Sequence, residues 1–295
     1  MRPFEPSGPQ QTDLDQRPKA RLEDLVDRYE AFLFDAYGVL VDKEGALPGA
    51  INLLKKLQRL GKPYGVVTNS AAHLPAHAAR RYQAFGLPLV AEDIVTAGSL
   101  IAGHFKSQGL EGRRCAVLGP RDSWSYVEAA GAEPVQPTSP FDVLVIGDQV
   151  GFPFLEFLDA TLSHLIRRFD ANQPVVLVLP NPDLIYPQGA GVGLTAGALA
   201  VLIEAVLAQR YPHRGDIRFT VLGKPQPALI EAGLARVGTR KALLLGDQRS
   251  TDIRAARAVG IDSVLLLSGV TTALDTDSSA EDAPTYVLQN LLEGP

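Results

Sequence analysis

The chain has 295 residues, of which 46% are hydrophobic and 21% are charged, and its formal net charge is −5 at pH 7. This composition is typical of a globular protein with a substantial core, in one large domain or two ordinary ones. Charges of both signs are interspersed and no basic block occurs, which argues against a nucleic-acid partner.

No apolar run approaches the roughly 20 residues that a membrane span requires. The first residues, Met1–Pro6, lack the apolar core of a signal peptide. A single cysteine, Cys115, excludes an internal disulfide and a Cys-rich metal site. We therefore expect a soluble cytoplasmic protein without a membrane partner.

The first predicted strand ends in a carboxylate. Residues 1–18 are rich in Pro, Gln and Asp and predict a flexible tail, and a short helix is expected over 21–30. Residues 32–34 form an apolar run typical of a strand buried on both faces, and Asp35 follows it. Ligands bind at the carboxyl ends of strands in open α/β sheets, so Asp35 is a candidate nucleophile or metal ligand. A turn-forming Asp is the alternative.

A second buried strand is expected over 64–67, after a helix over 48–60. It leads to Thr68, Asn69 and Ser70. Hydroxyl and amide groups at a strand end can hold a phosphate or a carboxylate by neutral hydrogen bonds. These residues also favour a helix N-cap, and the two roles are compatible because a helix N-terminus is itself an anion site.

Residues 76–204 show their own alternation of strands and helices. Strand-like runs occur at 94–95, 115–118, 143–146 and 175–179, and helical stretches at 75–86, 98–108, 122–131 and 153–169. This pattern predicts a second α/β domain, inserted into a core domain made of 19–75 and 205–295.

Polar residues follow two strands of the inserted domain. Asp148 comes after strand 143–146, and Asn181-Pro182-Asp183 comes after strand 175–179. They could face a ligand, but turn chemistry explains them equally well. Residues 187–197 are rich in glycine and predict a flexible loop, which no Gly-Lys-Ser/Thr follows as a P-loop would require.

A strand over 219–222 is expected to return the chain to the core domain, after a helix over 196–209. Lys224 follows it between Gly223 and Pro225. A lysine fixed in such a loop could neutralise a phosphate or hold a carboxylate nucleophile ionised. The default alternative is a solvated surface lysine.

A third buried strand, 243–245, ends in Gly246-Asp247, and Asp252 opens the next helix. Two carboxylates in one loop suggest a hard divalent cation such as Mg²⁺, although a turn and a helix cap would use the same residues. The remaining predicted elements are a helix over 253–259, a strand over 263–267, a polar loop over 274–284 and an edge strand over 286–288.

Four strand ends thus offer polar groups: Asp35, Thr68, Lys224, and Asp247 with Asp252. On one parallel sheet they converge at the carboxyl edge. A carboxylate nucleophile, a hydroxyl, a cation and a metal-holding pair suit phosphoryl transfer through an aspartyl-phosphate.

The same set resembles the haloacid dehalogenase (HAD) superfamily, in the same order along the chain. Residues 35–39 look like its motif I, 67–69 like motif II, 223–225 like motif III and 246–252 like motif IV. The insertion between motifs II and III resembles class IIA, the NagD-like or p-nitrophenyl phosphatase branch. The resemblance implies a Rossmann-like, doubly wound parallel-sheet core with an inserted α/β cap.

The resemblance also implies roles for individual residues. Asp35 would be the nucleophile, with Tyr37, Thr68 and Lys224 as further catalytic residues. Substrate would be bound by Thr68, Asn69, Ser70, Lys224, Asp148, Asn181 and Asp183. Mg²⁺ would be held by Asp35, the Tyr37 carbonyl, Asp247 and Asp252. The implied protein is a Mg²⁺-dependent phosphatase for a small phosphorylated metabolite, and relatives that dimerise through the cap imply a homodimer.

Tyr37 departs from this pattern, because phosphatases of the superfamily usually carry a second Asp at this position. A phenol, with an ordinary pKa near ~10, is a poor general acid at neutral pH. The Asp-Ala-Tyr-Gly sequence also resembles 2-haloacid dehalogenases, which need no metal. Against that alternative, their helical cap between motifs I and II is absent and Asp247/Asp252 look built for a metal. A third hypothesis is a non-catalytic protein that binds phosphorylated ligands.

Overall fold

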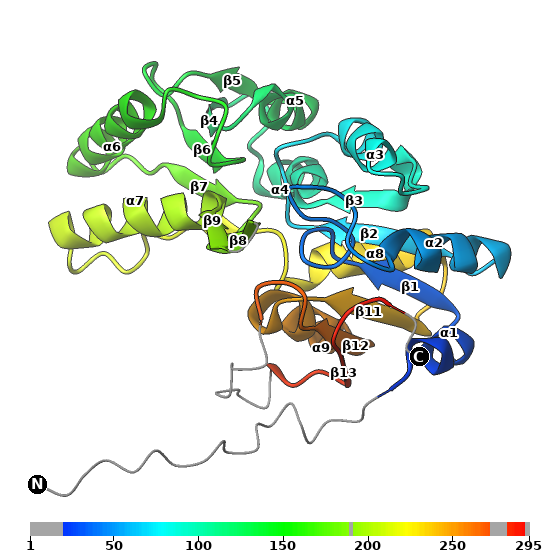
Figure 1. Cartoon of the computed structure of the whole chain (residues 1–295). Coiled ribbons are helices and arrows are strands. Elements are labelled where there is room, and N and C mark those ends of the chain that lie inside the picture. The colour runs from blue at the N-terminus through cyan, green and yellow to red at the C-terminus, as the bar shows by residue number, and fades with distance from the viewer. Residues whose placement is uncertain (1–19, 189–190, 272–281, 293–295) are drawn as a thin grey trace, which may run out of the picture.

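The computed structural model describes residues 20–188, 191–271 and 282–292, so the predicted tail (1–18) and most of the predicted polar loop (274–284) lie outside them. The described chain forms two α/β units (Figure 1). The first contains a six-stranded parallel sheet in the order β13-β12-β11-β1-β2-β3. Its strands are β1 (Ala31–Phe34), β2 (Tyr64–Thr68), β3 (Ile94–Thr96), β11 (Ala242–Gly246), β12 (Asp262–Leu266) and β13 (Tyr286–Leu288).

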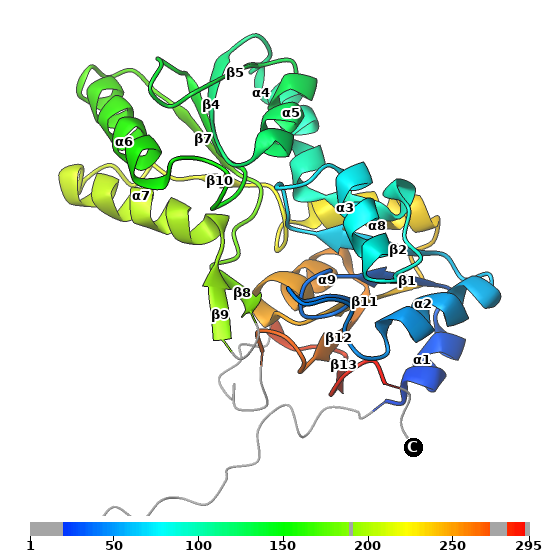
Figure 2. The same cartoon turned by 45° about the horizontal axis from the view of Figure 1, so that its top comes forward.

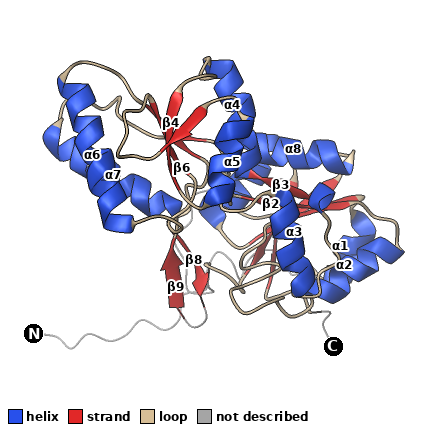
Figure 3. Ribbon diagram, turned by 90° about the horizontal axis from the view of Figure 1, so that it is seen from above, coloured by secondary structure: helices blue, strands red, loops and turns tan. Residues whose placement is uncertain are grey.

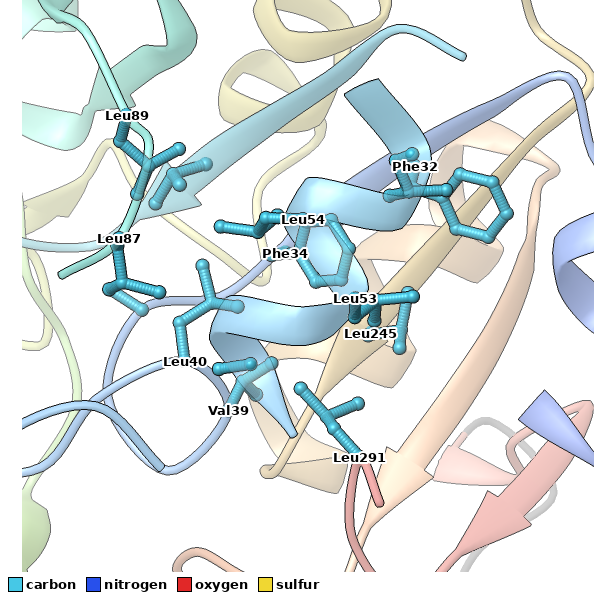
Figure 4. Close-up of a cluster of buried hydrophobic side chains, with 14 of the residues drawn as sticks. Phe32, Phe34, Val39, Leu40, Leu53, Leu54, Leu87, Leu89, Leu245 and Leu291 are labelled. Carbon is cyan, nitrogen blue, oxygen red and sulfur yellow. The ribbon is translucent and has the colours of Figure 1, made fainter. Parts of the chain in front are cut away.

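Helices cover both faces of this core sheet because its central strands are apolar on both sides. Phe32 and Phe34 of β1 pack on one face, with leucines of α2 such as Leu53 and Leu54 (Figure 4). Leu33 of β1 packs on the opposite face. The core helices are α1 (Leu22–Arg28), α2 (Ala50–Arg59), α3 (Pro75–Ala84), α8 (Pro227–Val237) and α9 (Arg254–Val259). This arrangement confirms the predicted doubly wound core.

The second unit, the cap, contains a five-stranded parallel sheet in the order β10-β7-β6-β4-β5. Its strands are β4 (Arg114–Leu118), β5 (Glu133–Val135), β6 (Val143–Ile146), β7 (Val176–Leu179) and β10 (Thr220–Val221). Its helices are α4 (Ile101–Gln108), α5 (Arg121–Ala129), α6 (Phe154–Asp170) and α7 (Ala196–Arg210). Successive residues of β6 pack on opposite faces, so the cap is an α/β layer structure of its own, as predicted.

Two strands correct the predicted domain boundaries. β3 pairs in parallel with β2, so the segment around 76–96, predicted for the cap, lies in the core. β10 pairs with β7, so the strand that was expected to return the chain to the core is the edge strand of the cap sheet. Both are short edge strands, and their sequences do not indicate which sheet they join.

The glycine-rich segment predicted as a flexible loop forms an antiparallel hairpin, β8 (Ile185–Gln188) and β9 (Gly191–Leu194). The hairpin extends from the cap toward the core (Figure 2). Tyr186 of β8 meets Tyr37 edge to face, with ring centroids 5.8 Å apart. The hairpin therefore brings a cap side chain to the carboxyl edge of the core sheet.

Helix α5 of the cap holds the core segment that enters α3. Ser123 donates to the Ala71 carbonyl (2.8 Å) and Tyr126 donates to the His73 carbonyl (2.7 Å). The Leu74 N–H donates to Asp122 (2.9 Å). Seen from above, α5 lies between the cap sheet and the core (Figure 3). Within the described residues, no helix is long and apolar enough to cross a membrane.

Candidate active site

The carboxyl ends of three neighbouring strands, β1, β2 and β11, define the site. Asp35 follows β1, and its N–H donates to the Leu245 carbonyl of β11 (2.8 Å). Thr68 ends β2 on the other side of β1, and Asp247 follows β11. The parallel register thus brings together residues that the sequence predicted at separate strand ends.

Lys224 is the buried cation of the site, with 2% of its surface exposed. Its Nζ donates to Asp35 Oδ1 (2.6 Å), to Asp252 Oδ1 (2.6 Å) and to the Val67 carbonyl (3.0 Å). Burial alone would lower the pKa of Lys224, but Asp252 and Asp35 raise it above its ordinary value. Lys224 is therefore a fixed positive charge, and the surface-lysine alternative is wrong.

Asp35 combines burial with a charged partner. Burial raises the pKa of Asp35 to about 6, while the charge of Lys224 opposes that rise. Desolvation disfavours an ionised carboxylate, and a neighbouring cation restores part of its stability. Near neutral pH the carboxylate form dominates, as a nucleophile requires.

The carboxylates of Asp35, Asp247 and Asp252 could hold a metal ion, since one oxygen of each lies within 4.8 Å of the others. Asp247 is fully buried; its Oδ2 accepts from the Val270 N–H (2.7 Å), whereas its Oδ1 has no hydrogen-bond partner among the described residues. Burial, followed by the charges of Asp252 and Asp35, raises the pKa of Asp247 well above its usual range. A buried carboxylate oxygen without a donor is costly, so this donor set fits a hard divalent cation.

Asp252 stabilises the loop that carries Asp247. Its Oδ1 accepts from Lys224, and its Oδ2 accepts from the N–H groups of Asp247 (3.2 Å) and Gln248 (3.1 Å). The helix predicted to open at Asp252 begins two residues later, after a π-helical turn over Arg249–Ile253.

Two glycines allow the backbone to approach Asp247. A Cβ on Gly269 would lie 2.0 Å from Asp247 Oδ2, and one on Gly38 would lie 2.3 Å from it. Gly38 also has a φ of +80°, which disfavours any other residue. Both loops are therefore shaped around the carboxylate.

Asn69 makes contacts that its predicted substrate-binding role did not include. Its side chain accepts from the Lys224 N–H (2.7 Å) and donates to the Lys224 carbonyl (3.0 Å) and to Asp183 Oδ1 (3.1 Å). The amide thus fixes the Lys224 loop and links it to the cap. The helix N-cap alternative for Thr68, Asn69 and Ser70 is wrong, because α3 begins at Pro75.

A cavity of about 340 Å³ lies between core and cap. It is lined by residues predicted for the site and by some that were not predicted. The predicted ones are Asp35, Tyr37, Thr68, Asn69, Ser70, Asp148, Asn181 and Asp183. The additional ones include Lys43, His73, Arg81, Tyr186 and Gln248. The ligand-facing alternative for Asp148 and Asn181–Asp183 therefore fits the structure, whereas no pattern in the sequence indicated Arg81 or Tyr186.

Two cap carboxyl groups on the cavity wall have raised pKa values. Burial raises the pKa of Asp148 to about 6, although backbone N–H groups including that of Val150 oppose it. Burial raises the pKa of Asp183 to about 7, against the charge of Lys224. Burial at the cavity wall thus favours the protonated, neutral form of both carboxyl groups.

Tyr37 places a phenol on the cavity wall. Its ring meets Tyr186 edge to face, and the guanidinium carbon of Arg81 lies 5.6 Å from its centroid. Burial raises the pKa of Tyr37, and the positive charge of Arg81 opposes that rise. The phenol therefore stays protonated at neutral pH.

Comparison with known proteins identifies relatives of the whole fold. A family model described as haloacid dehalogenase-like hydrolase matches residues 32–133, and a second, HAD-hydrolase-like model matches residues 221–294. Dihydroxyacetone phosphatase of Corynebacterium glutamicum is 26% identical over 267 residues, which cover 89% of this chain and 90% of the relative. The ribonucleotide monophosphatase NagD of Escherichia coli is 26% identical over 261 residues, covering 88% and 95%.

A solved structure extends this likeness to three dimensions. A Cytophaga hutchinsonii protein of the HAD superfamily, described as a possible sugar phosphatase, superposes with a TM-score of 0.80 at 26% identity. The match covers 93% of this chain and 98% of the solved one. The core and the cap thus occur together in these relatives.

Proposed function

Because the chain belongs to the haloacid dehalogenase-like hydrolases and its similar relatives are named as phosphatases, we propose that it is a Mg²⁺-dependent phosphatase for a small phosphorylated metabolite. One observation carries the proposal: Asp35 is ion-paired to the buried Lys224, beside the unsatisfied Oδ1 of Asp247. That arrangement places a nucleophile, a fixed cation and a metal ligand next to one another. It suits displacement at phosphorus.

In the proposed first step, an Asp35 carboxylate oxygen attacks phosphorus. A bond forms between Asp35 and phosphorus while the bond to the leaving oxygen breaks, and the alcohol departs after taking up a proton. Lys224 holds Asp35 in position, and Thr68 can donate to a phosphoryl oxygen. In the second step water attacks the aspartyl-phosphate, which releases phosphate and restores the Asp35 carboxylate.

Asp35, Asp247 and the Tyr37 carbonyl would hold Mg²⁺, with Asp252 as a support. When bound, the ion would neutralise the negative charge of the transferring phosphoryl group. The fully buried Asp247 with its free oxygen supports this assignment over metal-free dehalogenation, since that reaction would leave the oxygen unsatisfied.

Tyr37 makes the proposed enzyme slow. The phenol can donate a hydrogen bond to the leaving oxygen, but its raised pKa makes it a poor proton donor in the first step. Because it stays protonated, it also cannot act as the base that activates water in the second step. Loss of general acid–base help costs on the order of 10²–10⁴ in rate. Proton transfer is thus the weak part of the site.

The proposal is tested by hydrolysis of p-nitrophenyl phosphate with and without Mg²⁺, in wild type and Asp35→Asn. We expect slow, Mg²⁺-dependent hydrolysis in wild type and none in Asp35→Asn. Release of halide from 2-haloacids without metal would instead support the dehalogenase alternative, and binding without turnover would support a binding protein.

A further inference from the structure

Arg81 presents a guanidinium to the active-site cavity. It lies on α3, is half-buried, and lines the cavity together with Asp35, Tyr37 and Thr68. Its guanidinium carbon lies 5.6 Å from the Tyr37 ring centroid and 5.8 Å from that of Phe85. Within the described residues, no carboxylate forms an ion pair with it. The rings hold the cation in place without neutralising its charge.

The other basic side chains near the cavity are already paired with carboxylates, exposed to solvent, or neutral. The Lys224 charge is shared between Asp35 and Asp252. Lys43 is exposed at the rim. Burial lowers the pKa of His73, which keeps that imidazole neutral at pH 7. Arg81 is thus the half-buried cation that a second anionic group can reach.

Tyr37 preserves the charge of Arg81. A carboxylate at position 37 would pair with the guanidinium and repel an anionic group of the substrate. The side chain present at this position is an aromatic ring, which lies against the guanidinium without forming an ion pair with it. Arg81 therefore gives the cavity wall a positive charge at a different position from that of Lys224.

We propose that Arg81 binds a second anionic group of the substrate, so that the enzyme acts on phosphomonoesters that also carry a carboxylate or a second phosphate. This inference rests on the function proposed above and narrows its substrate class. The planar guanidinium suits bidentate binding of either group. A cavity of about 340 Å³ suits a small metabolite rather than a macromolecule.

The test measures binding rather than turnover. Isothermal titration calorimetry with Mg²⁺ compares propylphosphonate with 3-phosphonopropionate, in which a carboxylate replaces the terminal methyl group. Ethane-1,2-bisphosphonate supplies the phosphate-like alternative. We expect the second anionic group to tighten binding to wild type about tenfold or more, as a charge-assisted hydrogen bond would. Whichever of the two probes with a second anionic group binds more tightly identifies the preferred group.

Arg81→Met should abolish this preference and leave the propylphosphonate affinity within about twofold of wild type. Arg80→Met, at the exposed neighbouring position of α3, is the matched control and should keep the preference. Arg81→Lys retains the positive charge but lacks the planar guanidinium, so it should keep part of the preference for a second anionic group. Circular dichroism checks that each variant is folded.

Two results would overturn the inference. One is that wild type binds the probes with a second anionic group no more tightly than propylphosphonate. The other is that Arg81→Met weakens the binding of all probes equally, which would assign Arg81 to positioning Tyr37. The two proposals fail separately. If the protein hydrolyses p-nitrophenyl phosphate but shows no preference for probes with a second anionic group, only the proposed role of Arg81 is contradicted. If binding shows an Arg81-dependent preference for a second anionic group but no phosphate ester is hydrolysed, only the proposed phosphatase activity is contradicted.

Discussion

Lys224 Nζ lies 2.6 Å from Asp35 Oδ1, although 189 positions separate the two residues in the chain. The contact depends on how the fold positions each of the two residues. Asp35 is fixed by the end of β1, and the Lys224 backbone is fixed by Asn69. The stability of the site and its activity should therefore depend on this pair and on the neighbouring loop that carries Asp247 and Asp252.

Lys224→Met should abolish phosphatase activity and destabilise the fold. It leaves Asp35 and Asp252 buried without their cation, and removing one partner of a buried ion pair costs about 3–5 kcal/mol. Lys241→Met is the control, because Lys241 makes an exposed ion pair with Glu30 at 3.5 Å and should stay within about 1 kcal/mol of wild type. Urea denaturation at pH 7.5 measures both. Equal stability of the two variants would contradict the role of Lys224.

Tyr37→Asp should raise the rate by supplying the missing proton donor and base, by up to about 10²–10⁴. The gain should be largest for alkyl phosphates, whose leaving groups need a proton most. Tyr37→Phe, which removes only the hydroxyl, is the control and should show no gain. The measurement is kcat/KM over a series of phosphate esters. A folded, Mg²⁺-binding Tyr37→Asp variant without any gain would show that another group already supplies the proton.

Mg²⁺ should raise the melting temperature at pH 7.5 and have less effect at pH 5. The pKa of Asp35 is raised to about 6 and that of Asp247 is also raised, so the folded metal-free protein holds protons that the unfolded chain releases above about pH 4. Metal-free stability therefore falls as pH rises through this window, while ion binding strengthens. Binding contributes about 2.7 kcal/mol when free Mg²⁺ exceeds Kd a hundredfold.

Differential scanning calorimetry with and without Mg²⁺ checks this dependence. Asp247→Asn should lose the Mg²⁺ effect, whereas Asp159→Asn, at an exposed position of α6, should keep it. The same Mg²⁺ shift at both pH values, or a full shift in Asp247→Asn, would argue against this metal site.

Gly269→Ala should weaken Mg²⁺ binding and activity, because the new Cβ would lie 2.0 Å from Asp247 Oδ2. Either the loop or the carboxylate must then move. Gly103→Ala, in α4 with no atom within 4 Å of the new Cβ, is the control and should be neutral or stabilising by up to about 1 kcal/mol. Mg²⁺ titration by calorimetry compares the two. Unchanged affinity in Gly269→Ala would show that Asp247 does not need its present position.

The central sheet and the carboxyl-edge residues could be predicted from sequence because their signals are local. A strand such as 32–34 is apolar throughout, and the residue after it, Asp35, is polar. Parallel strands then place such residues at one edge. Sheet membership is not local, which is why β3 and β10 were assigned to the wrong units.

The missed parts of the site depend on tertiary packing. Arg81 lies within a helix, and nothing in its spacing shows that its guanidinium meets Tyr37. Tyr186 reaches the core only because a glycine-rich segment folds as a hairpin. Asn69 was predicted as a substrate ligand and lines the cavity, but the sequence did not indicate that its amide also binds Lys224 and Asp183. Such partners cannot be inferred from residue type alone.

The most direct measurement is chemical trapping of the phosphoenzyme. Wild type is mixed with Mg²⁺ and p-nitrophenyl phosphate, quenched in acid and reduced with borohydride, which converts an aspartyl-phosphate to homoserine. Peptide mass spectrometry then locates the product. We predict homoserine at position 35, and a substantial trapped fraction because Tyr37 is a poor base for the water step. Hydrolysis without any homoserine at position 35, or with reduction at another carboxylate, would contradict Asp35 as the nucleophile.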